Sequence, residues 1–131
     1  MKEKELINQA IAASKMAYAP YSNFQVGAAL LLDNGEIIQG CNVENASFGL
    51  TNCAERTALF TAIAAGHKRF KKLAIYVDRP AFTAPCGACR QVIHELAPGI
   101  EIILVNNRGE TKRTSDEELL PFSFGSADLE S

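Results

Sequence analysis

The second half of the sequence alternates between stretches that favour helices and short apolar runs that favour buried strands. The predicted order is helix, strand, helix, strand, over residues 53–65, 73–77, 86–96 and 101–105. Gly66 and Pro98 close the two helices, because glycine is favoured just after a helix and proline cannot continue one. Strands joined by helical crossovers lie parallel to one another, with helices on both faces of the sheet. We therefore expect an α/β fold with parallel central strands.

The first 41 residues predict a helix followed by a hairpin. Residues 2–17 place most of their apolar side chains along one stripe, as an amphipathic helix does. This stripe contains Leu6, Ile7, Ala10, Ile11, Ser14 and Met16. The Asp-Asn-Gly sequence at 33–35 is a strong turn signal between the runs 26–32 and 36–41, which we expect to form antiparallel strands. Far along the chain, Ser115 precedes acidic residues that suit the start of a short final helix.

Size and charge exclude several classes of protein. The chain has 131 residues and a formal net charge of −2. This length suits a single domain spanning 1–131, and the charge disfavours general nucleic-acid binding, which usually needs a basic excess. The first residues mix both signs of charge without an apolar core, and all apolar runs are much shorter than the roughly 20 residues that span a bilayer. We expect a cytoplasmic protein with no membrane role, whose basic residues 67–72 lie in solvent after a helix end.

Three of the four cysteines stand at predicted helix starts. Cys86 and Cys89 are three residues apart, so both sulfurs can reach one point beyond the end of their helix. Cys53 opens the other helix, and a helix N-terminus lowers the pKa of a thiol toward the thiolate that a metal needs. Three protein ligands leave one position of a tetrahedral Zn²⁺ site open for water, as in catalytic rather than structural sites. The sequence therefore predicts a catalytic zinc site.

Two charged residues follow Cys53 closely. Glu55 could accept a proton from a metal-bound water and later deliver it, as general acid–base catalysis requires. The alternative is that Glu55 only interacts favourably with the helix dipole. Three thiolates on Zn²⁺ leave a net negative charge, and we expect Arg56 to offset it by donating hydrogen bonds to the cysteine sulfurs.

The fourth cysteine and both histidines are predicted to lie outside the metal site. Cys41 ends a predicted strand without ligand-like spacing, and we expect it to be a small buried hydrophobic residue. His67 lies at a helix end in basic company and His94 in mid-helix, where packing or surface roles are commoner than ligation.

Several segments of the sequence resemble the short, homotetrameric, zinc-dependent cytidine deaminases. Cys53-Ala54-Glu55 together with Pro85-Cys86-Gly87-Ala88-Cys89 is similar to the signature of zinc deaminases. Further matching segments span residues 21–30, 42–46, 53–58 and 119–125. The resemblance implies a three-layer α/β/α cytidine-deaminase-like fold with a five-stranded mixed sheet and an antiparallel N-terminal hairpin. It also implies a homotetramer with one Zn²⁺ per subunit.

The resemblance further implies a reaction. In this family, free cytidine and 2′-deoxycytidine are hydrolysed to uridine and 2′-deoxyuridine with release of ammonia, for pyrimidine salvage. A zinc-bound hydroxide attacks C4 of cytosine. The residue at the position of Glu55 protonates N3 and then carries a proton to the departing amine.

Substrate contacts are implied at Phe24, Asn42, Glu44 and Ala54, with Phe124 reaching the base from a neighbouring subunit. An amide beside a carboxylate supplies the donor and the acceptor that a ribose 3′-hydroxyl needs, which suits Asn42 and Glu44. The ring of Phe24 offers the base or sugar a flat apolar wall. Plain core packing for the two phenylalanines, and loop organisation for Asn42 and Glu44, are the alternatives.

The resemblance also implies that Ala46 and Phe48 line a pocket between subunits, near the 5′ end of the nucleoside. Family members often have tyrosine where this chain has Phe48, so a hydroxyl group is missing here. A water molecule could take its place in binding the 5′-hydroxyl.

Three rival interpretations share parts of the pattern. A blasticidin-S-type deaminase would have the same metal motif and length, although Phe24, Asn42 and Glu44 favour a nucleoside. A polynucleotide-editing deaminase would need a basic channel for the strand, which the net charge disfavours. In a non-enzymatic zinc module the metal would only stabilise the fold, and Glu55 would have no chemical task.

Overall fold

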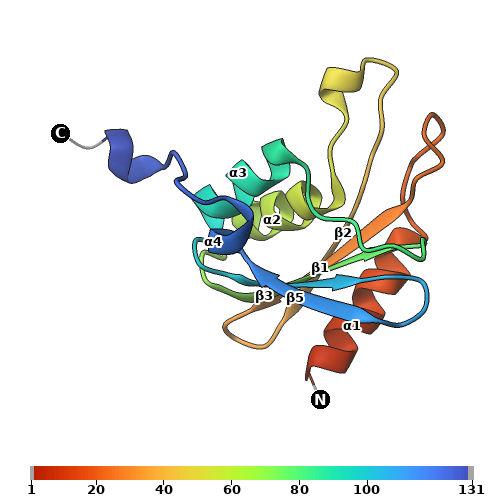
Figure 1. Ribbon diagram of the computed structural model, residues 1–131, viewed down its shortest axis with the longest axis horizontal. Helices are drawn as coiled ribbons and strands as arrows, with labels where there is room; N and C mark the ends of the chain where they lie inside the picture. Colours follow the sequence, from red (N-terminus) through yellow and green to blue (C-terminus); the bar gives the residue numbers. More distant parts are fainter. Residues whose placement is uncertain (1, 130–131) are drawn as a thin grey trace.

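A computed structural model describes residues 2–129 and contains four α-helices, five strands and two short 3₁₀ helices (Figure 1). In chain order the elements are α1 (Lys2–Ser14), β1 (Val26–Leu32), β2 (Ile37–Cys41), η1 (Phe48–Leu50), α2 (Ala54–Ala64), β3 (Phe70–Val77), α3 (Gly87–Leu96), β4 (Glu101–Val105), β5 (Thr111–Ser115), α4 (Asp116–Leu119) and η2 (Ser126–Leu129). Within this part of the chain, no helix has the length and apolar composition that a bilayer crossing requires.

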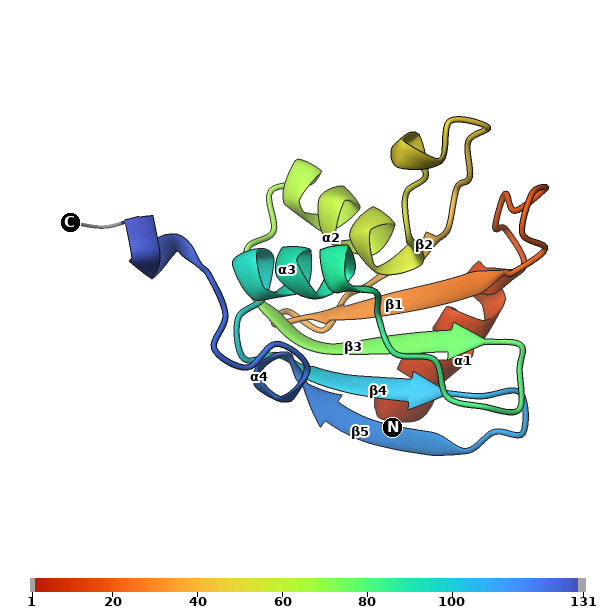
Figure 2. The same cartoon turned by 45° about the horizontal axis from the view of Figure 1, so that its top comes forward.

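The strands form one mixed sheet in the order β2-β1-β3-β4-β5 (Figure 2). The central pair β3 and β4 is parallel, whereas β1 pairs antiparallel with both β2 and β3. The predicted hairpin and parallel centre are therefore confirmed. The fifth strand, β5, runs antiparallel along β4, and its polar sequence carries no apolar alternation by which it could have been located.

Helices cover both faces of the sheet, which confirms the three-layer α/β/α fold. Alternate residues of β1 point to opposite faces, as the pleat of a strand requires. Ala28, Leu30 and Leu32 pack in the core beneath α2 and α3, whereas Ala29 and Leu31 pack with residues of α1. Figure 2 shows α1 behind the strands and the pair α2 and α3 above them, on the other side of the sheet.

One close approach between main chains positions α2. A Cβ atom at Gly40 in β2 would lie 2.5 Å from the carbonyl oxygen of Ala54 and 2.5 Å from the amide nitrogen of Ala58. Only a residue without a side chain leaves room for this contact. The first turn of α2 therefore rests directly on the backbone of β2.

Two predicted boundaries are wrong. The first helix ends at Ser14 rather than residue 17, and Met16, which we placed on its buried stripe, is 76% exposed. Strand β3 begins at Phe70 and includes Lys72, which we expected to lie free in solvent after a helix. The Lys72 ammonium instead pairs with Glu3 at 3.2 Å and Glu101 at 3.6 Å, because the sheet extends further than its apolar run.

Candidate metal centre and active site

The N-termini of α2 and α3 bring three cysteines together. Cys53 and Cys86 are the N-cap residues of α2 and α3, and Cys89 lies in the first turn of α3. Their sulfur atoms all lie within 4.8 Å of one another, and those of Cys86 and Cys89 are 3.2 Å apart. Among residues 2–129 these side chains form the only group of three or more such ligands that could hold a metal ion.

The chemistry of this donor set fits a zinc ion. A hydrogen bond from Cys89, reinforced by Arg56, lowers the pKa of Cys53 to about 5, while the same contact raises the pKa of Cys89. The sulfurs thus share protons at close range, which a divalent cation would displace as thiolates form. Sulfur ligands in threes or fours are typical of zinc, and three of them leave one position free.

Glu55 lies beside these cysteines, in the first turn of α2, and only 4% of it is exposed. Burial raises the pKa of its carboxyl group to about 7. A carboxyl group with such a value can both hold and release a proton near neutral pH. Burying an ionisable carboxyl group is costly, so its place at the wall of a cavity suggests a chemical task.

Arg56 points its guanidinium group toward the sulfur cluster. Its Nη2 atom donates to Cys53 Sγ at 3.2 Å and to the carbonyl oxygen of Thr51 at 3.4 Å. The contact with Cys53 raises the pKa of Arg56, so the group is cationic at any relevant pH. It therefore offsets negative charge on the Cys53 sulfur.

A cavity of about 390 Å³ opens in front of these groups. Phe24, Asn42, Glu44, Ala54 and Glu55 all line it, together with the ligand candidates Cys53 and Cys86. The buried Cys89 lies behind the wall. The volume of the cavity is within the range of binding sites for small organic ligands.

Several lining residues were not predicted from the sequence: Ser22, Val26, Thr51, Ile75, Val77, Thr83 and Ala84. A usable signal existed for two of them. Ile75 and Val77 lie toward the carboxyl end of β3, and ligands in α/β sheets commonly bind beyond the carboxyl ends of the strands. Thr51 and Thr83 come from loops whose path only the folded chain defines.

Asn42 is buried and connects two segments of the cavity wall. Its Oδ1 atom accepts from the amide of Val26 at 2.9 Å, and its Nδ2 atom donates to the carbonyl oxygen of Phe24 at 2.7 Å. Because both partners are main-chain groups, Asn42 holds the start of β1 and the backbone of Phe24 in place. The ring of Phe24 is covered on one side by the Arg79 guanidinium, 4.6 Å from the ring centre.

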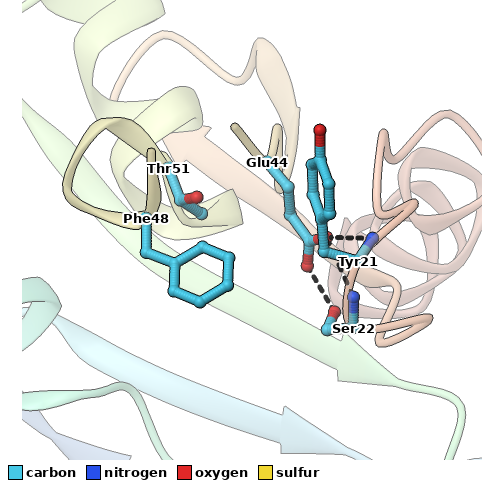
Figure 3. Close-up of a pocket in the computed structure, with 5 residues that line it drawn as sticks. All are labelled: Tyr21, Ser22, Glu44, Phe48 and Thr51. Carbon is cyan, nitrogen blue, oxygen red and sulfur yellow. Dashed lines mark hydrogen bonds between the residues drawn. The ribbon is translucent and has the colours of Figure 1, made fainter. Parts of the chain in front are cut away.

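Glu44 is bound by the turn before β1. One carboxylate oxygen accepts from the amides of Tyr21 at 3.0 Å and Ser22 at 3.1 Å, and the Ser22 hydroxyl donates to the other oxygen (Figure 3). The hydrogen bond from the Ser22 hydroxyl is the main cause that lowers the pKa of Glu44. The group therefore carries a full negative charge at neutral pH.

The residues predicted to act between subunits lie apart from this cavity. Phe48 is 76% exposed and lines a second cavity of about 330 Å³ with Tyr21, Ser22, Glu44 and Thr51 (Figure 3). Ala46 is exposed in the same loop. Phe124 lies in the C-terminal segment and lines neither cavity.

Cys41 and the histidines lie outside the sulfur cluster. Cys41 was predicted to be buried, but it is only half-buried, because β2 is an edge strand. Partial burial still raises the pKa of its thiol.

Comparisons with known proteins agree with this arrangement. The family model of the cytidine and deoxycytidylate deaminase zinc-binding region matches residues 1–105. The cytidine deaminase of Halalkalibacterium halodurans is 48% identical over 130 residues, covering 98% of both chains. That of Sporosarcina psychrophila is 46% identical, covering 98% of this chain and 96% of its relative. The crystal structure of cytidine deaminase from Burkholderia pseudomallei superposes with a TM-score of 0.92 at 52% identity, covering 95% of this chain and 100% of the other.

Proposed function

We propose that this chain, which belongs to the cytidine and deoxycytidylate deaminase family, hydrolyses free cytidine to uridine and ammonia. One observation carries the proposal: three cysteine sulfurs within 4.8 Å of one another and a buried glutamate meet at the wall of a cavity large enough for a nucleoside. A non-enzymatic protein, in which zinc only stabilises the fold, would not need that carboxyl group.

Zn²⁺ is the cofactor, and we propose that Cys53, Cys86 and Cys89 hold one ion per subunit. When bound in such a site, zinc makes a coordinated water acidic enough to supply a nucleophile near neutral pH. Arg56 keeps the donor set from accumulating negative charge, since its guanidinium group donates to Cys53 Sγ at 3.2 Å.

Glu55 is the proton carrier in this proposal. The first turn of α2 places its carboxyl group beside Cys53, at the cavity wall, where solvent water is largely excluded. The carboxylate takes a proton from the attacking water and delivers it to N3 of the cytosine ring. A second proton, from the hydroxyl group added at C4, then passes through Glu55 to the exocyclic amine, and the C4–N bond breaks to release ammonia as the C4 carbonyl forms.

The other end of the cavity suits a ribose or deoxyribose. The second N–H of the Asn42 amide remains after its bond to Phe24, and the Glu44 carboxylate can accept more bonds than the three it receives. A 3′-hydroxyl can therefore accept from Asn42 and donate to Glu44 at once. Phe24 and Ala54 contribute apolar surface between this end and the metal end.

We further propose a homotetramer in which Phe124 of one subunit reaches the base bound by another, and Ala46 and Phe48 face its 5′ end. Exposed aromatic side chains support an assembly, because Phe48, Phe122 and Phe124 are 76%, 107% and 60% exposed.

Residues 106–131 are proposed to complete the same domain, since β5 pairs with β4. Thiolate ligands need a reducing compartment, which favours a cytoplasmic enzyme of pyrimidine salvage.

The test is a comparison of substrates with the purified zinc-loaded protein. Turnover of cytidine and 2′-deoxycytidine should exceed that of cytosine, deoxycytidylate and blasticidin S, and elemental analysis should give about one zinc per subunit. Negligible activity on cytidine would contradict the proposal. Sedimentation that finds an active monomer would contradict the tetramer and the role of Phe124, but not the chemistry.

A further inference from the structure

The C-terminal segment, residues 121–125, is held on α3 by two side chains one helical turn apart. Gln91 donates from Nε2 to the carbonyl oxygen of Phe124 at 2.9 Å. The Nε2 atom of His94 lies 3.0 Å from the hydroxyl oxygen of Ser123. Figure 1 shows the chain leaving α4, passing the end of α3 and then projecting away from the body of the molecule.

Gly125 adds a third contact with the same histidine. A Cβ atom at this position would lie 3.0 Å from His94 Nε2 and 3.3 Å from His94 Cδ2, so the backbone passes tightly over the edge of the ring. Three successive residues, 123 to 125, are thus touched by Gln91 and His94. The main chain of Phe124 is held on both sides.

His94 is itself fixed from behind by a buried acid. Its Nδ1 atom lies 3.0 Å from Asp116 Oδ2, which also accepts from the Gly99 amide at 2.9 Å. Asp116 is 2% exposed, and its other oxygen has no hydrogen-bond partner among residues 2–129. A carboxylate on Nδ1 places the proton there in the neutral ring, so Nε2 is left to accept from the Ser123 hydroxyl.

We propose that His94 is a positioning residue, which couples the core through Asp116 to the C-terminal segment through Ser123 and thereby sets where Phe124 points. The side chain of Phe124 is 60% exposed although its backbone is held, whereas Phe122 is fully exposed at a positive φ of 51°. The bridge therefore presents one of the two phenylalanines in a defined position. This inference rests on the proposed role of Phe124 in a neighbouring subunit's pocket.

The consequence for catalysis is a division between binding and chemistry. A loosened segment must be ordered again whenever nucleoside binds, which weakens binding while leaving the metal and Glu55 untouched. Substitutions in the bridge should therefore raise KM without lowering kcat.

Ser123→Ala is the cleanest test, because it removes the outer bond and leaves Asp116 paired. His94→Asn is the second variant, since its amide can keep the bond to Asp116 while losing Ser123. His94→Ala would leave a buried carboxylate without its main partner and risks unfolding. Ser126→Ala is the matched control, because the Ser126 hydroxyl makes no hydrogen bond within the described residues and the residue is exposed.

Three readouts are measured on the zinc-loaded protein: amide hydrogen exchange of residues 122–125, steady-state kinetics on cytidine and zinc content. Ser123→Ala and His94→Asn should each exchange faster in this segment and raise KM about three- to tenfold, the loss expected for one hydrogen bond. Adding Ser123→Ala to His94→Asn should change KM little further, because both remove the same bond. Zinc content and kcat should match the control.

Unchanged amide exchange in residues 122–125, or a KM equal to that of Ser126→Ala, would overturn the inference. Phe124→Ala separates this failure from that of the proposed function. If Phe124→Ala raises KM while the bridge variants do not, the bridge is wrong and the pocket contact stands. If Phe124→Ala leaves KM unchanged, the pocket contact is wrong, and the exchange measurement still decides whether His94 holds the segment.

Discussion

The metal end of the cavity and the end that we propose binds the sugar are built in different ways. At the metal end, Cys53, Glu55 and Cys86 come from the first residues of α2 and α3, two helices that pack on the sheet and on each other. At the sugar end, Asn42 and Glu44 come from the loop after β2. Their polar atoms are already bonded to the turn and strand before them.

The difference shows how one chain separates chemistry from recognition. Groups that move protons or hold an ion must keep their positions to a fraction of an ångström, and helix ends backed by a core provide that rigidity. Groups that recognise a sugar can lie on loops, provided that other hydrogen bonds hold them. Substitutions at the metal end should therefore act on kcat, and those at the sugar end on KM.

The strongest test of this separation is Glu55→Gln. An amide fills the same space but cannot carry protons, so kcat should fall by about 10²–10⁴-fold while zinc content stays at the wild-type level. Steady-state kinetics and elemental analysis measure both quantities. Glu117→Gln, an exposed acid in α4, is the control. A variant with the full catalytic rate would remove Glu55 from the mechanism.

Arg56→Gln should have the next largest effect. Loss of the cation beside Cys53 leaves the sulfur donors with uncompensated charge, and kcat should fall by about 10- to 100-fold, with weaker zinc retention against a chelator. Arg56→Lys keeps the charge without the planar donor group, so its kcat should lie between those of Arg56→Gln and the unmodified protein. Kinetics and zinc release equal to those of the unmodified protein would contradict this role.

Asn42→Ala tests the sugar end. Two partly buried main-chain groups lose their partner, so the free energy of unfolding should fall by about 1–3 kcal/mol and KM for cytidine should rise about tenfold. Chemical denaturation and kinetics provide the two values. Asn42→Asp keeps an acceptor for Val26 but sets a carboxylate oxygen against the Phe24 carbonyl oxygen, so it should lose at least as much stability. A fall in kcat with KM unchanged would break the separation between the two ends.

Ser22→Ala should have the smallest effect. The Ser22 hydroxyl donates to Glu44 and accepts from the Phe24 amide at 3.0 Å, but it is exposed to solvent, and water can replace it. We expect KM to rise about twofold. Ser126→Ala, an exposed serine of the C-terminal segment, serves as the reference, and a rise in KM no larger in Ser22→Ala than in this reference would contradict the role of Ser22 in holding Glu44.

The features predicted best from the sequence are those set by nearby residues. The starts of α2 and α3 lie within one residue of their predicted positions, because cysteines followed by helix-forming residues define an N-terminus locally. The hairpin of β1 and β2 was equally clear from its Asp-Asn-Gly turn. Strand β5 was not located, because Thr111–Ser115 owes its conformation to pairing with β4 and not to its own apolar pattern.

The same distinction between local and long-range contacts holds for the candidate site. Spacing alone brought Cys86 and Cys89 together, but that Cys53 joins them depends on how α2 and α3 pack. The hydrogen bonds of Asn42 to Phe24 and Val26 join residues 16 to 18 positions apart, and no local rule predicts them. The contacts assigned to Phe48 and Phe124 remain predictions, because they involve a second chain.

The contact at Gly40 gives the metal site an unusual dependence on a residue that has no side chain and supplies no ligand. A methyl group there would sit 2.5 Å from main-chain atoms of Ala54 and Ala58, far inside van der Waals contact, and no rotamer change could relieve the overlap. The helix would have to lift, and Cys53 would leave its two sulfur partners. Random mutagenesis for zinc-deficient protein should therefore recover position 40 alongside the ligands themselves, although this glycine never meets the ion or the nucleoside.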